Sequence, residues 1–216
     1  MPTDAEISME FAVSRHTARA AVQQLVIDGM VKRYPGKGSF VLRQAPASER
    51  WALRSLDDVV ERTFGEALSL ISVDRLSAGS LPLAAEALQL TPEQQMSRLL
   101  WLRLTDGAPN AFCRVYVAGH YGRALPADLS EQLQRSTLIS LLEARCGVRA
   151  HRMRQETSAV QADPDLARLL GVAPNSPLLL LARIYSEKDG TPIEYSEAYC
   201  RPDRQKQIVE LSRSDG

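Results

Sequence analysis

Hydroxyl and guanidinium side chains gather near the start of the chain, where together they could bind a polyanion. They stand at the beginning of a helix predicted over residues 15–28, and they are Ser14, Arg15, Thr17 and Arg19. The unpaired N–H groups and the dipole of a helix N-terminus favour an anion there. Guanidinium groups bind phosphates and the O6 and N7 atoms of guanine. These residue types at one helix end therefore indicate contact with the phosphates and base edges of duplex DNA.

A second group of basic residues follows on a predicted hairpin. Two short segments, at 31–33 and 39–42, flank a Pro-Gly-Lys-Gly turn and are expected to be strands. The candidate contacts on this hairpin are Lys32, Arg33, Lys37 and Gly38. Residues 13–43 hold six Lys and Arg against one acid, whereas the whole chain has 26 basic and 26 acidic residues. The basic bias is local, as expected for an electrostatic footprint on nucleic acid.

Two helices and a tight turn must position these side chains. Thr3 and Glu6 have the spacing of a capping box, which opens a first short helix. Ser14 is a candidate N-cap of the second helix, on which Ala18 and Val22 lie on one apolar face. This is the arrangement in which a second helix enters the major groove with its N-terminus first. The spacing alone is also compatible with a pair of helices whose arginines face solvent and which does not bind DNA.

Composition limits the class of protein. The chain of 216 residues is 44% apolar and 24% charged, which is typical of a globular chain with one small and one ordinary domain. No run of 18 apolar residues predicts a membrane span, and the polar N-terminus does not resemble a signal peptide. The three Cys have no disulfide or zinc spacing. We expect a cytoplasmic protein without metal or cofactor.

The chain is expected to divide into a DNA-binding domain over 1–43, a polar linker over 44–49 and a second domain over 50–216. Strands of the second domain are predicted over 68–76, 96–104, 111–117, 149–161, 178–186, 193–200 and 207–211. Helices are predicted over 83–90, 127–134, 138–146 and 163–170.

Two stretches of the second domain repeat one pattern. Residues 84–117 and 166–199 each contain a helix, a strand with an arginine, an Asp-Gly turn and a further strand. Asp-Gly between two strand patterns is a strong hairpin signal. A duplicated helix and hairpin predicts an antiparallel sheet with pseudo-twofold symmetry. With helices on one side of this sheet, the expected fold class is α+β.

The N-terminal segment resembles the winged helix-turn-helix of GntR-family transcriptional regulators. The resemblance is carried by Val-Ser-Arg-His-Thr-Ala-Arg at 13–19, Leu25, Gly29 and Gly-Lys-Gly-Ser-Phe-Val at 36–41. It implies that the second helix contacts the major groove and that the wing tip contacts the minor groove. Members of the family have a further helix ahead of this segment, so we expect a winged helix that lacks its first helix.

The second domain resembles the effector-binding UTRA domain of the HutC branch, which has a chorismate-lyase-like fold. Leu-Arg-Leu-Thr-Asp-Gly-Ala-Pro at 102–109 and the stretch 192–204 carry the resemblance. It implies a pocket for a small metabolite, with Arg103 at an anionic group, Thr137 at a phosphate, and Glu194 and Tyr199 at hydroxyls or an amine. The implied effector contacts are Arg54, Ser55, Asp57, Arg103, Thr137, Glu194 and Tyr199.

Several positions depart from the pattern of phosphosugar-binding members. Trp101 replaces an arginine, Cys113 a glutamate and Ile139 a tyrosine, and Asp57 replaces a hydroxyl that would meet phosphate. We therefore expect a different effector. The arginines favour an anion, and the carboxylates could receive an amine, so a small amino acid or an aminophosphonate is one hypothesis.

The expected function is that of a DNA-binding transcriptional regulator. We expect a metabolite-responsive repressor of a catabolic or uptake operon that binds double-stranded operator DNA as a homodimer. Two alternatives remain open from the sequence: a chorismate-lyase-like enzyme, and a sensor that no longer binds DNA. An enzyme is not favoured, because Cys113 and His120, the one imaginable nucleophile and base, have no orienting partner in the pattern.

Overall fold

The structure of the chain is a computed structural model. It covers residues 2–27, 31–34, 38–41, 56 and 67–207. Contacts divide the chain into two compact units, 1–50 and 51–216, and each is treated by itself.

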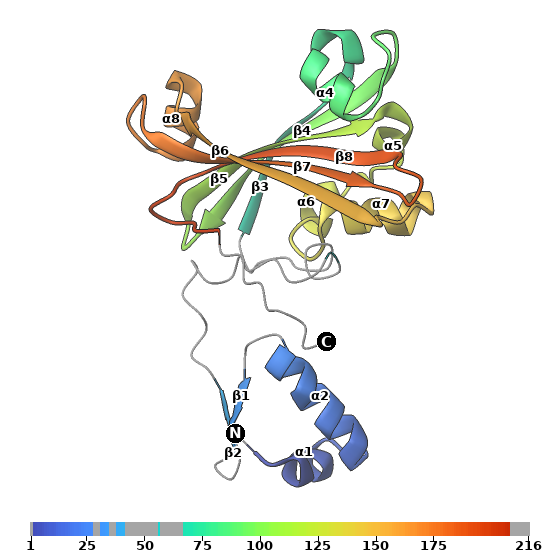
Figure 1. The fold of residues 1–216 in the computed structure, drawn as a ribbon, viewed down its shortest axis with the longest axis vertical. Helices are drawn as coiled ribbons and strands as arrows, with labels where there is room; N and C mark the ends of the chain where they lie inside the picture. The colour runs from blue at the N-terminus through green and yellow to red at the C-terminus, as the bar shows by residue number, and fades with distance from the viewer. Residues whose placement is uncertain (1, 28–30, 35–37, 42–55, 57–66, 208–216) are drawn as a thin grey trace, which may run out of the picture. The chain divides into compact units, whose positions relative to one another are not determined.

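The N-terminal unit is a helix-turn-helix followed by a hairpin (Figure 1). It consists of α1 (Asp4–Glu10), α2 (Arg15–Ile27), β1 (Val31–Tyr34) and β2 (Gly38–Val41), and the two strands pair antiparallel. The predicted capping box is confirmed, because the Thr3 N–H donates to Oε2 of Glu6 at 2.7 Å and the Glu6 N–H donates to Oγ1 of Thr3 at 3.3 Å. Local hydrogen bonding therefore begins α1 where the sequence predicts it.

A tight turn joins the two helices. Ala12 has φ +51, a left-handed conformation that residues with a Cβ adopt at some cost. Ser8 Oγ donates to the carbonyl of Val13 at 2.7 Å and closes the turn. The predicted N-cap of α2 is present, since the Thr17 N–H donates to Oγ of Ser14 at 3.0 Å. Ala18 on α2 is buried, so this face of the helix packs within the N-terminal unit.

The second unit is built on one six-stranded antiparallel sheet with the order β3-β4-β5-β8-β7-β6. The strands are β3 (Ala67–Ser77), β4 (Gln95–Thr105), β5 (Ala108–Ala118), β6 (Arg152–Gln161), β7 (Pro177–Ser186) and β8 (Pro192–Cys200). The two halves, β3-β4-β5 and β6-β7-β8, follow the same path and meet at the β5–β8 pair. There Arg114 lies opposite Glu197. This order agrees with the predicted duplication.

The helices of this unit cover both faces of the sheet (Figure 1). They are α4 (Pro82–Ala87), α5 (Gly119–Arg123), α6 (Leu129–Gln132), α7 (Leu138–Cys146) and α8 (Pro164–Leu170), with a 3₁₀ turn at Ala78–Ser80. α4 and α8 pack on one face, against Tyr116 and Phe112. α6 and α7 pack on the other, against Trp101 and Cys113.

The expectation of helices on one side was therefore wrong. The physical reason lies in the central strand β5, in which consecutive residues 110–113 and 115–118 are buried. A strand that is apolar on both faces must be covered on both.

Turns and element ends agree closely with the sequence patterns. Asp106 and Gly107 both have positive φ, +52 and +75, as an Asp-Gly hairpin turn requires. Gly147 and Gly171 end α7 and α8 in the left-handed conformation. The strand expected over 207–211 is not seen at Gln207, and its other residues lie outside the described part of the chain.

Candidate functional site

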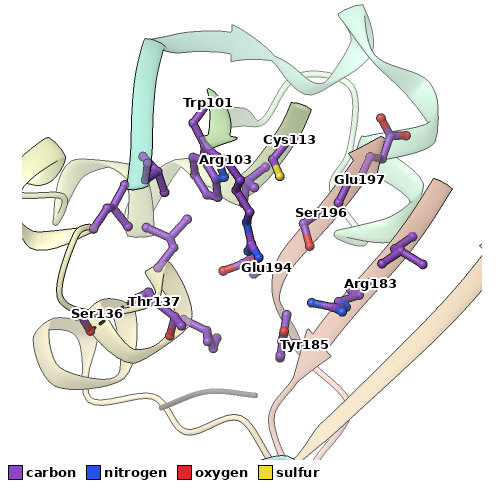
Figure 2. Close-up of a pocket in the computed structure, with 17 residues that line it drawn as sticks. Trp101, Arg103, Cys113, Ser136, Thr137, Arg183, Tyr185, Glu194, Ser196 and Glu197 are labelled. Carbon is purple, nitrogen blue, oxygen red and sulfur yellow. Dashed lines mark hydrogen bonds between the residues drawn. The ribbon is translucent and has the colours of Figure 1, made fainter. Parts of the chain in front are cut away.

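A cavity lies between the sheet and the segment that leads into α7 (Figure 2). Its cavity volume is about 80 Å³, and the space between its walls, including the part open to solvent, is about 820 Å³. Its walls come from β3, β4, β5, β7 and β8 and from residues 133–139. Because side chains alternate along a strand, β8 presents Glu194, Ser196 and Ala198 to this face. The register places Arg183 opposite Ser196 and Tyr185 opposite Glu194, which brings their side chains to the same side.

Two arginines bring positive charge into the cavity. Arg183, on β7, is 8% exposed, and its Nε donates to Oε1 of Gln155 at 2.7 Å. Arg103, on β4, is half-buried and lines the same cavity. Buried guanidinium groups need compensating charge. A planar fork of donors suits a carboxylate, phosphate or phosphonate, so this wall favours an anion.

A buried carboxyl group stands beside the arginines. Glu194 is 6% exposed, and its Oε2 has no hydrogen-bond partner among the described residues. Burial raises the pKa of Glu194 to about 7, although the positive charges of Arg183 and Arg103 and a hydrogen bond from Ser196 act to lower it. Near neutral pH this carboxyl can accept or give up a proton. Figure 2 shows that the side chains of Arg103 and Glu194 extend toward one another.

The N-terminus of α7 forms part of the opposite wall. Thr137 is the N-cap, and its Oγ1 accepts from the Ser140 N–H at 3.2 Å. Ser136 and Thr137 both line the cavity. The first turn of a helix carries unpaired N–H groups and a partial positive charge, so this end adds to the positive potential of the arginines.

The structure brings three of the seven predicted effector contacts together: Arg103, Thr137 and Glu194 line the cavity. Arg54, Ser55 and Asp57 lie outside the described residues. Sequence reasoning did not identify Arg183, Tyr185 and Ser196. The register of the β7–β8 hairpin was the missing information, since it places Arg183 opposite Ser196 and Tyr185 opposite Glu194 on one face.

Tyr199 is a correction, because it lies on the opposite face of the sheet and does not line the cavity. Its hydroxyl donates to Oε2 of Glu197 at 3.2 Å and accepts from Nη1 of Arg114 at 3.2 Å. Burial, followed by the charge of Glu197, raises the pKa of Tyr199 to about 12. The physical reason is strand alternation: five residues separate Tyr199 from Glu194, and an odd separation reverses the face.

The candidate DNA contacts of the N-terminal unit are partly described. Ser14, Arg15 and Thr17 are exposed at the start of α2. The side chain of Arg19 is 72% exposed, and its Nε contacts Oδ2 of Asp4 at 3.3 Å. Two further candidates, Lys32 and Arg33, belong to β1, but their side chains are outside the description; Gly38 begins β2, and Lys37 lies beyond the described residues.

Other site types find little support in the described part of the chain. It contains no group of three or more His, Cys, Asp or Glu that could hold a metal ion. No helix in it is long and apolar enough to cross a membrane.

Comparison with known proteins agrees with both units. Residues 1–41 match the family of bacterial regulatory proteins called gntR, and residues 68–206 match the UTRA domain. The chain is 31% identical over 213 residues to the probable transcriptional regulator PhnF of Escherichia coli, covering 94% of this chain and 83% of the relative. It is 26% identical over 206 residues to the transcriptional repressor NagR of Bacillus subtilis, covering 94% and 82%.

A solved structure shows the same fold. The possible transcriptional regulator YydK of Bacillus subtilis superposes with a TM-score of 0.66 at 18% identity, covering 98% of this chain and 89% of that one. The matches of both units and the 31% identity to a regulator over most of the chain show that this is a DNA-binding transcriptional regulator of the GntR family, of the HutC type with a UTRA domain.

Proposed function

We propose that this protein is a metabolite-responsive repressor, in which a small anionic effector in the UTRA cavity changes the affinity of the N-terminal unit for operator DNA. The observation that carries the proposal is the cavity, where two arginines, a helix N-terminus and a buried carboxyl converge. The name of NagR, a transcriptional repressor, supports the sign of regulation. In a family of transcriptional regulators, we take this cavity to be the site that binds the effector.

The DNA-binding surface that we propose is the exposed N-terminal end of α2 with the hairpin wing. It consists of Ser14, Arg15, Thr17, Arg19, Lys32, Arg33, Lys37 and Gly38. Exposed hydroxyl and guanidinium groups at the start of α2 support base and phosphate contacts. Gly38 begins β2 and lets the hairpin approach a backbone closely.

The effector contacts that we propose are Arg103, Thr137 and Glu194, with Arg54, Ser55 and Asp57 from the segment before β3. The first three line the cavity. The guanidinium of Arg103 and the N-terminus of α7 favour an anionic group, and Glu194 accepts a hydrogen bond from the ligand.

Coupling requires that effector and DNA prefer different conformations of the same protein. We propose a homodimer in the cytoplasm, because two symmetric heads would bind the two half-sites of a pseudo-palindromic operator. We also propose that the cavity binds its ligand without converting it. Recovery of an unchanged ligand after incubation with the protein would support binding over the lyase-like alternative.

The test starts with selection of bound duplexes from a random DNA library. Affinity of the full chain for the selected duplex is then measured by fluorescence anisotropy at several salt concentrations. We expect affinity to fall steeply with salt, and Arg15→Ala to weaken it by about 1–3 kcal/mol if Arg15 reads a base. Arg168→Ala is the matched control, because Arg168 is an exposed arginine of α8 in the other unit. Absence of any salt-dependent binding would refute the proposal.

A further inference from the structure

Two polar atoms at the cavity have no partner in the described part of the chain. They are Oε2 of Glu194 and Nε1 of Trp101, and both are buried. Both residues line the cavity. A buried polar group without a partner is destabilising, and this cost ends when a ligand supplies the partner. Oε2 of Glu194 can accept a hydrogen bond from a donor on the ligand, and the N–H of Trp101 can donate one to an acceptor on the ligand.

The charges around these atoms divide the cavity into two kinds of contact. Arg103 comes from β4, Arg183 from β7, and the N-terminus of α7 lies at Thr137. All three favour an anionic group. Glu194 lies on β8 and brings a buried carboxyl into the cavity, where the charges of the two arginines act on its ionisation. Figure 2 shows Arg103 and Glu194 converging, with Arg183 and Tyr185 beside them on the neighbouring strand.

We propose that the effector is a small ampholyte, whose anionic group binds Arg103 and Arg183 and whose ammonium group donates to Oε2 of Glu194, while the indole N–H of Trp101 donates to an oxygen of the ligand. This inference rests on the proposed function, because it takes the cavity to be the effector site. It adds the chemical class of the ligand.

An ammonium group fits Glu194 better than a hydroxyl does. Removing a carboxylate from water is costly, and a contacting positive charge compensates this cost more strongly than a neutral donor. Arginines and a carboxyl in one cavity are complementary to a ligand that carries both an anionic group and an ammonium group.

Ionisation of Glu194 gives the proposal a measurable signature. Among the described residues, the titratable or charged side chains that line the cavity with Glu194 are Arg103 from β4, Cys113 from β5, Arg183 and Tyr185 from β7, and Glu197 from β8, which pairs with Arg114. Residues 133–139, on the helical side, add only Arg135, which is exposed and does not line the cavity. With a pKa of about 7, Glu194 is partly protonated near neutral pH. An ammonium group that pairs with Oε2 favours the ionised form, so binding releases a proton. An anion without an amine causes no such release from Glu194, and propionate, which is already fully ionised at neutral pH, releases no proton of its own.

Matched ligands test the proposal by isothermal titration calorimetry of the full chain. The probes are 2-aminoethylphosphonate against ethylphosphonate, and β-alanine against propionate, at neutral pH in PIPES and in Tris, buffers whose ionisation enthalpies differ. We expect at least one ampholyte to bind tenfold or more tightly than its partner without the amine, with release of a proton. Glu194→Gln should abolish both the preference and the proton release and leave binding of the simple anion within about twofold.

Two further variants are compared in the same calorimetric titrations. Trp101→Phe keeps an aromatic ring and removes the N–H, so it should weaken both members of a pair equally. Glu156→Gln changes an exposed carboxylate on β6 that pairs with Arg154, and it should behave as wild type.

Equal binding within both pairs, a preference that survives in Glu194→Gln, or no binding of either ampholyte would overturn the proposal. N-acetylglucosamine 6-phosphate, an anion without a free amine, separates this failure from failure of the proposed function. If it alone binds and weakens DNA binding, the protein is an effector-responsive regulator and the ampholyte proposal is refuted.

Discussion

Replacing Glu194 by Gln should change how the stability of the protein depends on pH. The carboxyl of Glu194 is buried, and its pKa in the folded chain is about 7, above the ordinary value of 4.5. The folded state therefore holds a proton at pH values where the unfolded chain has released it. Stability is greatest below the unfolded pKa and falls as pH rises through the folded pKa. Gln is close in shape and does not titrate, so the variant lacks this loss.

The expected size follows from the two pKa values. Between about pH 5 and about pH 8.5 the wild-type chain should lose about 2.5 kcal/mol of unfolding free energy through this one group, at about 1.4 kcal/mol per pKa unit. Other groups also titrate over this range, but they are shared by both proteins. The difference in unfolding free energy, Glu194→Gln minus wild type, should therefore grow by about 2.5 kcal/mol from the acidic to the alkaline end.

Urea unfolding of both full-length proteins, followed by tryptophan fluorescence, measures this difference. Trp101 lies in the wall of the same cavity and reports on this unit. Glu156→Gln, at an exposed carboxylate, provides the control and should run parallel to wild type. Parallel stability curves for wild type and Glu194→Gln would show that burial does not raise the pKa of Glu194.

Substitutions at three other positions test local features. Ala12→Gly should stabilise the N-terminal unit by about 0.5–1 kcal/mol in thermal unfolding, because glycine adopts positive φ without the strain of a Cβ; a destabilised variant would contradict this. Thr137→Ala should cost about 1 kcal/mol in urea unfolding through loss of the N-cap of α7, and Thr137→Ser should keep it. Asp4→Asn should strengthen DNA binding in anisotropy measurements and change stability by less than about 1 kcal/mol, since it releases the exposed Arg19 from its ion pair. Unchanged or weaker binding would argue against Arg19 as a DNA contact.

Local patterns predicted much of the fold. The capping box at Thr3 and the Asp-Gly turn at 106–107 depend on residues close in sequence, and the structure has both. The repeated helix and hairpin predicted a duplicated antiparallel sheet, which the strand order contains. What local patterns could not show was the coverage of the sheet by helices on both faces, since this depends on how β5 packs between β4 and β8.

The residues of the candidate site were predicted only in part, because strand pairing brings some of them together. Arg103 and Glu194 carry chemistry that is visible in the sequence, and both line the cavity. Assigning Arg183 to the cavity requires the register of the β7–β8 hairpin, in which Arg183 lies opposite Ser196. Tyr199 was predicted as an effector contact, but its position on β8 is odd relative to Glu194, so it faces the other side of the sheet.

The path of the chain between the two halves of the sheet has an evolutionary consequence. Each half brings its own helix, α4 or α8, to one face, whereas α5, α6 and α7 all belong to the connection 119–151 that joins the halves. This spacer supplies the Ser136 and Thr137 side of the cavity. Ligand preference can therefore diversify through changes in the spacer while the inherited duplicate framework stays intact.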